Sequence, residues 1–137
     1  GVAVEREVEP GLFVRGDKDL LYRAFYNILV NGQQAMDGPG IVRIRGGLEP
    51  DQGNGPGRVR LEFLDSGPGF DPATLPSLLD PFFTTKDGGT GLGLPIVQSI
   101  IASHGGQIEL ENGPEGGALV RVLLPAADLK APEVQDE

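Results

Sequence analysis

Two apolar helical segments, each placed between pairs of strand-like segments, constrain the fold more than any other feature of this sequence. The first predicted helix begins after Asp17, a residue suited to capping the free amides of a helix, and runs to about Met36. The second extends over Leu94–His104, with Pro95 in the first turn, where no backbone hydrogen bond is lost. The strand-like segments, which are apolar or alternate apolar with polar residues, are Val2–Val8, Leu12–Val14, Ile41–Arg45, Arg58–Asp65, Gln107–Asn112 and Ala118–Pro125.

This order of elements predicts an α+β fold. Strands grouped between helices favour a two-layer α/β sandwich, with a mixed, mostly antiparallel sheet and the helices on one face. One or two helical turns fit within Asp71–Asp80, and residues 81–93 are predicted to form a mobile loop rich in glycine. We expect a single domain over residues 1–126, followed by an acidic, disordered tail at residues 127–137.

Composition supports one folded domain, although 22 glycines and 12 prolines make up about a quarter of the 137 residues. Hydrophobic residues account for 39% of the chain, enough for one core. The 20 acidic and 11 basic side chains give a net charge of -9, which argues against binding to nucleic acids or anionic membranes. The sequence has no cysteine, no membrane-spanning stretch and no signal peptide, so we expect a cytoplasmic location.

Three amide side chains follow one face of the first helix. Asn27 and Asn31 are four residues apart, and Gln34 continues the same stripe. Taken alone, the stripe fits a solvated polar face or structural hydrogen bonds. An asparagine oxygen is also a neutral ligand suited to Mg²⁺, which shares its coordination with phosphate and water. Both interpretations stay open on the stripe alone.

Two glycine-rich segments lie where the backbone can approach a ligand. The segment Asp65–Gly69, with the sequence DSGPG, follows directly on a predicted strand. It forms either a simple tight turn or a place where an ionised Asp65 accepts a hydrogen bond from an amine, such as that of adenine. The segment Gly88–Gly93 leads into the second helix, whose N-terminus favours phosphate, although its spacing is neither that of a P-loop nor that of a dinucleotide fold. A flexible linker is the alternative for this segment.

Together these segments resemble the catalytic ATP-binding domain of sensor histidine kinases, within the GHKL superfamily, whose fold is the Bergerat ATP-binding fold. The resemblance covers about residues 17–124. The matching motifs, in order, are an N box at Asn27–Asn31, a G1 box at Asp65–Gly69, an F box at Pro81–Lys86 and a G2 box at Gly89–Leu94. The form of the F box, PFFTTK, is most similar to that of the nitrogen-regulation subgroup.

The resemblance implies that the chain binds ATP and Mg²⁺ through these motifs. Asn31 would coordinate Mg²⁺, Asn27 would contact phosphate, and Asp65 would hold the adenine amine. Phe83 would anchor the lid, and Lys86 would contact the γ-phosphate. The implied catalytic residues are Asn27, Asn31 and Lys86. The implied nucleotide contacts are Asn27, Asn31, Gln34, Asp65, Gly67, Gly69, Phe83, Gly89, Thr90, Gly91, Leu92, Gly93 and Leu94.

Several positions depart from the family's pattern. Gly32 stands where alanine is usual, which weakens the helix by up to about 1 kcal/mol. Gln34 stands where many relatives have lysine, and Pro95 replaces a common serine. Members of the superfamily that hydrolyse ATP have glutamate at the first N-box position, where a carboxylate can activate water, but here that residue is Asn27. The resemblance therefore favours phosphoryl transfer over hydrolysis.

The phosphoacceptor is expected outside this sequence. His104, the one histidine, is followed by two glycines instead of the acidic residue typical of the family's acceptor, so we expect it to be structural. The implied partners are a histidine hairpin domain, in the same longer protein or on a partner chain, and a response regulator downstream. This segment itself is expected to be monomeric. It is also expected to be the cytoplasmic part of a sensor kinase. The alternatives are a GHKL-type ATPase, an anti-sigma-like serine kinase and an inactive nucleotide-binding module.

Overall fold

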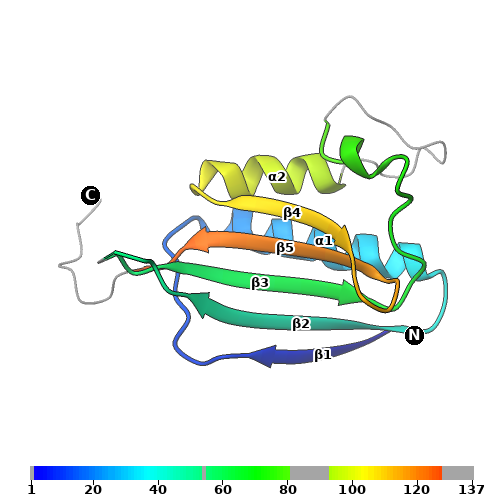
Figure 1. Ribbon diagram of the computed structural model, residues 1–137, viewed down its shortest axis with the longest axis horizontal. Coiled ribbons are helices and arrows are strands. Elements are labelled where there is room, and N and C mark those ends of the chain that lie inside the picture. Colours follow the sequence, from blue (N-terminus) through cyan, green and yellow to red (C-terminus); the bar gives the residue numbers. More distant parts are fainter. Residues whose placement is uncertain (1, 54, 81–92, 128–137) are drawn as a thin grey trace.

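The computed structural model describes residues 2–53, 55–80 and 93–127, which form a five-stranded sheet and two α-helices (Figure 1). In chain order the elements are β1 (Val2–Val8), α1 (Lys18–Met36), β2 (Gly40–Glu49), β3 (Arg58–Asp65), a short 3-10 helix η1 (Leu75–Ser77), α2 (Gly93–Ser103), β4 (Gln107–Asn112) and β5 (Ala118–Pro125). In the described parts of the chain, no helix has the length and apolar character needed to cross a bilayer.

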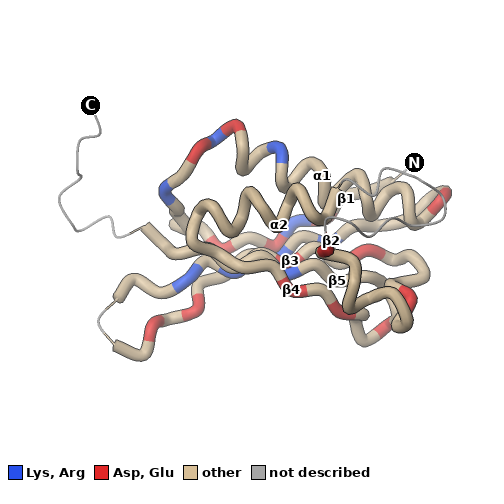
Figure 2. The backbone as a smooth tube through the Cα atoms, turned by 90° about the horizontal axis from the view of Figure 1, so that it is seen from above, with Lys and Arg blue, Asp and Glu red and all other residues tan. Residues whose placement is uncertain are grey.

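The strands lie in the order β1-β2-β3-β5-β4. β1 runs parallel to β2, with Val2 opposite Gly40, and the other neighbouring strands are antiparallel. Figures 1 and 2 show α1 and α2 side by side on one face of this sheet, while no described helix covers the other face. The predicted two-layer sandwich with a mixed, mostly antiparallel sheet is confirmed.

The hydrophobic core lies between the helices and the sheet face that they cover. Side chains alternate along a strand, so Phe63 of β3 and Val122 of β5 point toward the helices. On α1, Leu21, Ala24 and Ile28 recur at helical spacing and are buried, which explains why this segment forms a helix on the sheet. The buried cluster consists of Leu21, Ala24, Ile28, Phe63, Val97, Ile100, Ile101, Ile108, Val120, Val122 and Leu124.

Asp17 begins α1 as predicted. Its carboxylate Oδ1 accepts hydrogen bonds from the backbone N–H groups of Asp19 (2.9 Å) and Leu20 (3.1 Å). The backbone N–H of Asp17 donates in turn to Nε2 of His104 (3.0 Å), and Nδ1 of His104 donates to the carbonyl oxygen of Ile100 (2.8 Å). Because a backbone N–H can only donate, the proton of the neutral imidazole lies on Nδ1. His104 thus joins the end of α2 to the start of α1, which agrees with its expected structural role.

The predicted strand at Leu12–Val14 is wrong, because this segment has no strand pairing. Among the described residues, its backbone is joined to the C-terminal segment by one hydrogen bond, which the N–H of Ala127 donates to the carbonyl oxygen of Phe13 (2.7 Å). Its side chains explain the apolar pattern instead, because Val14 packs against the core and Leu12 lies over Gly46 of β2. An apolar run therefore indicated burial here without indicating which backbone partner the segment has.

The predicted end of the strand at Ile41–Arg45 also changes. β2 extends beyond the predicted Ile41–Arg45 to Glu49, because its register with β3 continues to the pair Glu49 and Arg58, whose side chains form an ion pair (2.8 Å). The helical turns expected within Asp71–Asp80 are confirmed as the short helix η1. The predicted mobile loop and acidic tail fall largely at residues 81–92 and 128–137, which lie outside the described residues.

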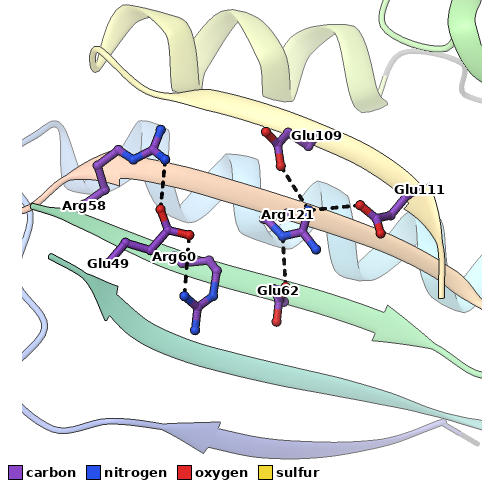
Figure 3. A network of polar contacts seen from close by, with 7 residues as sticks. All are labelled: Glu49, Arg58, Arg60, Glu62, Glu109, Glu111 and Arg121. Atoms are coloured by element: carbon purple, nitrogen blue, oxygen red, sulfur yellow. Dashed lines mark hydrogen bonds and ion pairs between the residues drawn. The ribbon is translucent and has the colours of Figure 1, made fainter. Parts of the chain in front are cut away.

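Arg121 of β5 organises ion pairs on the uncovered face of the sheet (Figure 3). Its Nε donates to Glu62 of β3 (2.9 Å), and its Nη1 donates to both Glu109 and Glu111 of β4 (3.0 Å each). These hydrogen bonds raise the pKa of the Arg121 guanidinium above its ordinary value, and the bond to Glu109 makes the largest contribution. Because a guanidinium stays charged at all ordinary pH values, Arg121 can pair with these carboxylates wherever they are ionised, and it then links the three strands.

We expect Arg121→Met to lower the free energy of unfolding by about 1–2 kcal/mol, between the values for exposed and for buried ion pairs. The substitution keeps an apolar stem but leaves Glu62, Glu109 and Glu111 facing one another without a cation. Urea denaturation at low ionic strength measures this change, and added salt should reduce it by screening the repulsion.

Arg45→Met is the matched control. Arg45 lies opposite Glu62 in the register of β2 with β3, on the same face, but forms no ion pair with any described residue. Its substitution should change the free energy of unfolding by less than about 0.5 kcal/mol. Equal losses in the two variants would contradict a specific role of Arg121 and indicate a general charge effect.

Candidate functional site

Asp65 is the one buried charged residue in the described part of the chain, with 9% of its surface exposed. It ends β3, and its Oδ1 accepts hydrogen bonds from the backbone N–H groups of Gly67 (2.9 Å) and Ala118 (3.1 Å). No described residue donates to the second oxygen, Oδ2, which faces Gly32 of α1. The fold therefore holds this carboxylate in place through one oxygen and leaves the other able to accept a hydrogen bond from a ligand.

A cavity of about 60 Å³ opens beside Asp65, between α1 and the sheet. Asn31 and Asp65 are its two polar side chains, and the rest of the lining is apolar or glycine. A flat, largely apolar group with one amine donor fits this combination of surfaces. The lining residues are Ile28, Asn31, Gly32, Ala35, Val42, Phe63, Asp65, Gly69, Phe70, Leu94, Ala118 and Val120.

The loop after β3 forms one wall of the cavity, and Asn112 at the end of β4 holds it there. Asn112 Oδ1 accepts from the backbone N–H of Phe70 (2.7 Å), and its Nδ2 donates to the carbonyl oxygen of Phe70 (3.1 Å). Gly69 has a φ of 83°, and a Cβ there would lie 2.7 Å from Asn112 Oδ1, so only glycine allows this close approach. No sequence motif pointed to Asn112 or Phe70, because asparagine at a strand end is typical of any turn.

Asn31 connects the cavity to the N-terminus of α2. Its side chain packs against Gly93, the first residue of α2, where a Cβ would lie 2.8 Å from Asn31 Oδ1 and still closer to its Nδ2. Glycine at position 93 therefore lets the start of α2 reach Asn31, and Leu94 continues into the cavity wall. The free amides of a helix N-terminus favour anions, so this end of the site is suited to phosphate.

The structure brings part of the predicted site together. Asn31, Asp65, Gly69 and Leu94 line the cavity, and Gly67 and Gly93 lie beside it. Asn27 is half-buried one turn before Asn31 on α1, while Gln34 is exposed in the turn after it, and neither lines the cavity. The remaining predicted site residues lie outside the described residues: Phe83, Lys86, Gly89, Thr90, Gly91 and Leu92.

A metal ion at this site would depend on few protein ligands. The described residues contain no group of three or more histidine, cysteine, aspartate or glutamate side chains able to hold a metal. The oxygen of Asn31 is a donor that suits Mg²⁺, which commonly takes one or two protein ligands and fills its other positions with phosphate and water. The donor set thus fits Mg²⁺ that arrives with a nucleotide better than a resident metal.

Comparisons with known proteins place this arrangement in a family. The family described as histidine kinase-, DNA gyrase B- and HSP90-like ATPase matches residues 16–128. The nitrogen regulation protein NtrY of Azorhizobium caulinodans is 38% identical over 132 residues, which cover 95% of this chain and 17% of that protein. This chain thus spans about a sixth of that relative, and about a third of NtrB of Rhodobacter capsulatus, another curated relative.

Solved structures of sensor kinases share the fold. The mycobacterial sensor histidine kinase MprB has a TM-score of 0.77 at 30% identity, over 91% of this chain and 82% of that one. Full-length ShkA, solved in complex with AMPPNP, has a TM-score of 0.74 at 26% identity, over 93% of this chain and 26% of that one. The resemblance to histidine kinase catalytic domains is confirmed, and this chain belongs to the histidine kinase-, DNA gyrase B- and HSP90-like ATPase family.

Proposed function

We propose that this chain binds ATP with Mg²⁺ and donates the γ-phosphoryl group to a histidine on a separate phosphoacceptor domain. The observation that carries the proposal is the hydrogen bonding of the Asp65 carboxylate, in which one oxygen is held by the backbone and the other has no described donor. Two backbone amides hold its Oδ1, so its Oδ2 presents a fixed acceptor at the apolar end of the cavity. An ionised carboxylate only accepts hydrogen bonds, which suits the exocyclic amine of adenine and disfavours a carbonyl at the same position.

The end of the site at which α2 begins supports the proposed binding of a triphosphate. α2 begins beside Asn31, and the backbone amides of a helix's first turn have no partner within the helix. A chain with a net charge of -9 needs such local positive potential to hold a polyanion. When bound, Mg²⁺ would neutralise charge between phosphate oxygens, with Asn31 as its protein ligand. Lys86 is proposed as the γ-phosphate contact. The proposal for ATP is also supported by ShkA, which was solved with the ATP analogue AMPPNP.

Transfer is favoured over hydrolysis by the residue at position 27. An amide has no useful basicity, so Asn27 cannot activate a water molecule as a carboxylate does.

Both ring nitrogens of His104 are engaged with backbone groups, which leaves this imidazole poorly suited to accept phosphate. We therefore propose an acceptor on a histidine hairpin domain, a response regulator downstream and a cytoplasmic location, where ATP is available.

Incubation with γ-labelled Mg-ATP and a histidine hairpin domain of a sensor kinase tests this function. We expect label on the hairpin domain that is stable in base and lost in acid, as for phosphohistidine. Acid-stable label on a serine would support the serine-kinase alternative, and release of inorganic phosphate alone would support an ATPase. Bound nucleotide that is neither transferred nor hydrolysed would indicate an inactive nucleotide-binding module.

Asp65→Asn should weaken ATP binding about 10- to 100-fold, the range for loss of a hydrogen bond to a charged group. The amide oxygen of the variant can still accept from Gly67 and Ala118, so the fold should persist, while its NH₂ group faces the adenine amine. Calorimetry with ATP and with inosine triphosphate measures the change. The preference for ATP should shrink or reverse, because inosine has a carbonyl where adenine has an amine.

Asn31→Ala should reduce phosphoryl transfer more than it reduces affinity for ADP. In the presence of Mg²⁺, the affinity for ATP should fall about tenfold or more, while adenosine, which has no phosphate, should bind almost unchanged. Titration of Mg²⁺ at fixed nucleotide concentration gives a measurement that does not depend on activity, and the dependence on Mg²⁺ should weaken. Equal affinity losses for adenosine and ATP would contradict a metal-binding role of Asn31.

A further inference from the structure

Gly32 occupies the interior of α1 without any steric need for glycine. Its backbone is not in the left-handed region, and a Cβ added there would lie 3.4 Å from Asp65 Oδ2, 3.6 Å from Asp65 Cβ and 3.8 Å from Val42 Cγ2. These are ordinary van der Waals distances, so alanine fits this position. Glycine in a helix interior is destabilising relative to alanine because it loses more backbone freedom on folding. The helix therefore carries a cost at position 32 that packing does not explain.

The consequence of this glycine is space beside the acceptor of the site. Gly32 lines the cavity, and the methyl group that it lacks would lie against Asp65 Oδ2, the oxygen that no described residue bonds. Val42 bounds the same space from β2 and is buried. A group held by Asp65 Oδ2 would thus lie next to the methyl position that Gly32 leaves unfilled.

We propose that Gly32 sets the base selectivity of the site, so that it accepts N6-monoalkylated adenine nucleotides as well as ATP. This inference rests on the proposed binding of ATP. A secondary amine keeps one N–H for Asp65 Oδ2 and directs its alkyl group into the space that Gly32 leaves. A tertiary amine has no N–H and loses the hydrogen bond whatever the space. Alanine at position 32 would fill the space and exclude the alkyl group without touching the hydrogen bond.

Calorimetric titration of ATP, N6-methyl-ATP and N6,N6-dimethyl-ATP into the unmodified chain and into Gly32→Ala tests the proposal. For the unmodified chain, we expect N6-methyl-ATP to bind within about threefold of ATP and the dimethyl analogue to bind at least about tenfold more weakly. In Gly32→Ala, the ratio of the N6-methyl-ATP affinity to the ATP affinity should fall about tenfold or more, as for one surplus methyl group in a filled pocket.

Gln33→Ala is the matched control, because Gln33 is the next residue of α1, is exposed and does not line the cavity. This substitution raises helix propensity without changing the site. The ratio of the N6-methyl-ATP affinity to the ATP affinity should therefore be the same in Gln33→Ala as in the unmodified chain. The proposal is overturned if Gly32→Ala leaves the ratio unchanged, or if the unmodified chain rejects N6-methyl-ATP as strongly as the dimethyl analogue. Failure to bind ATP at all would instead remove the proposed function, and the inference with it.

Discussion

A carboxylate buried at the end of a central strand needs hydrogen-bond donors, and the way in which Asp65 obtains them organises the site. Its two donors come from Gly67 in the loop after β3 and from Ala118 at the start of β5. Burial of a charge without such partners is costly, so the loop and the adjacent strand are fixed relative to each other. Because both bonds use Oδ1, the constraint that stabilises the fold also leaves Oδ2, which faces Gly32, without a donor among the described residues.

Much of the fold could be predicted because local sequence determines it. The helix α1 follows from the cap at Asp17 and from apolar residues at helical spacing, and both are local signals. The failure at Leu12–Val14 has the opposite cause. Val14 packs against the core and Leu12 lies over Gly46 of β2, and whether a segment also joins a sheet depends on distant backbone that spacing does not encode. The end of β2 at Glu49 was missed for the same reason, because pairing with Arg58 extends it.

The candidate site likewise contains residues that local sequence predicts and residues that only tertiary contacts reveal. Asn31, Asp65, Gly69 and Leu94 were predicted from motifs, and all four line one cavity. Asn112 was not predicted, because its role exists only through contact with a loop 42 residues earlier in the chain. Residues whose chemistry is visible in their type can be found from sequence, whereas residues that position others need the tertiary structure.

Helix α1 relates the two ends of the site to each other. Its neighbouring residues Asn31 and Gly32 face the start of α2 and the carboxylate of Asp65, respectively. The helix is held at its start by the hydrogen bond from Asp17 to His104, and it ends at Asp37 in a left-handed cap. Any displacement of α1 over the sheet would therefore move Asn31 relative to the start of α2 and Gly32 relative to Asp65 at the same time.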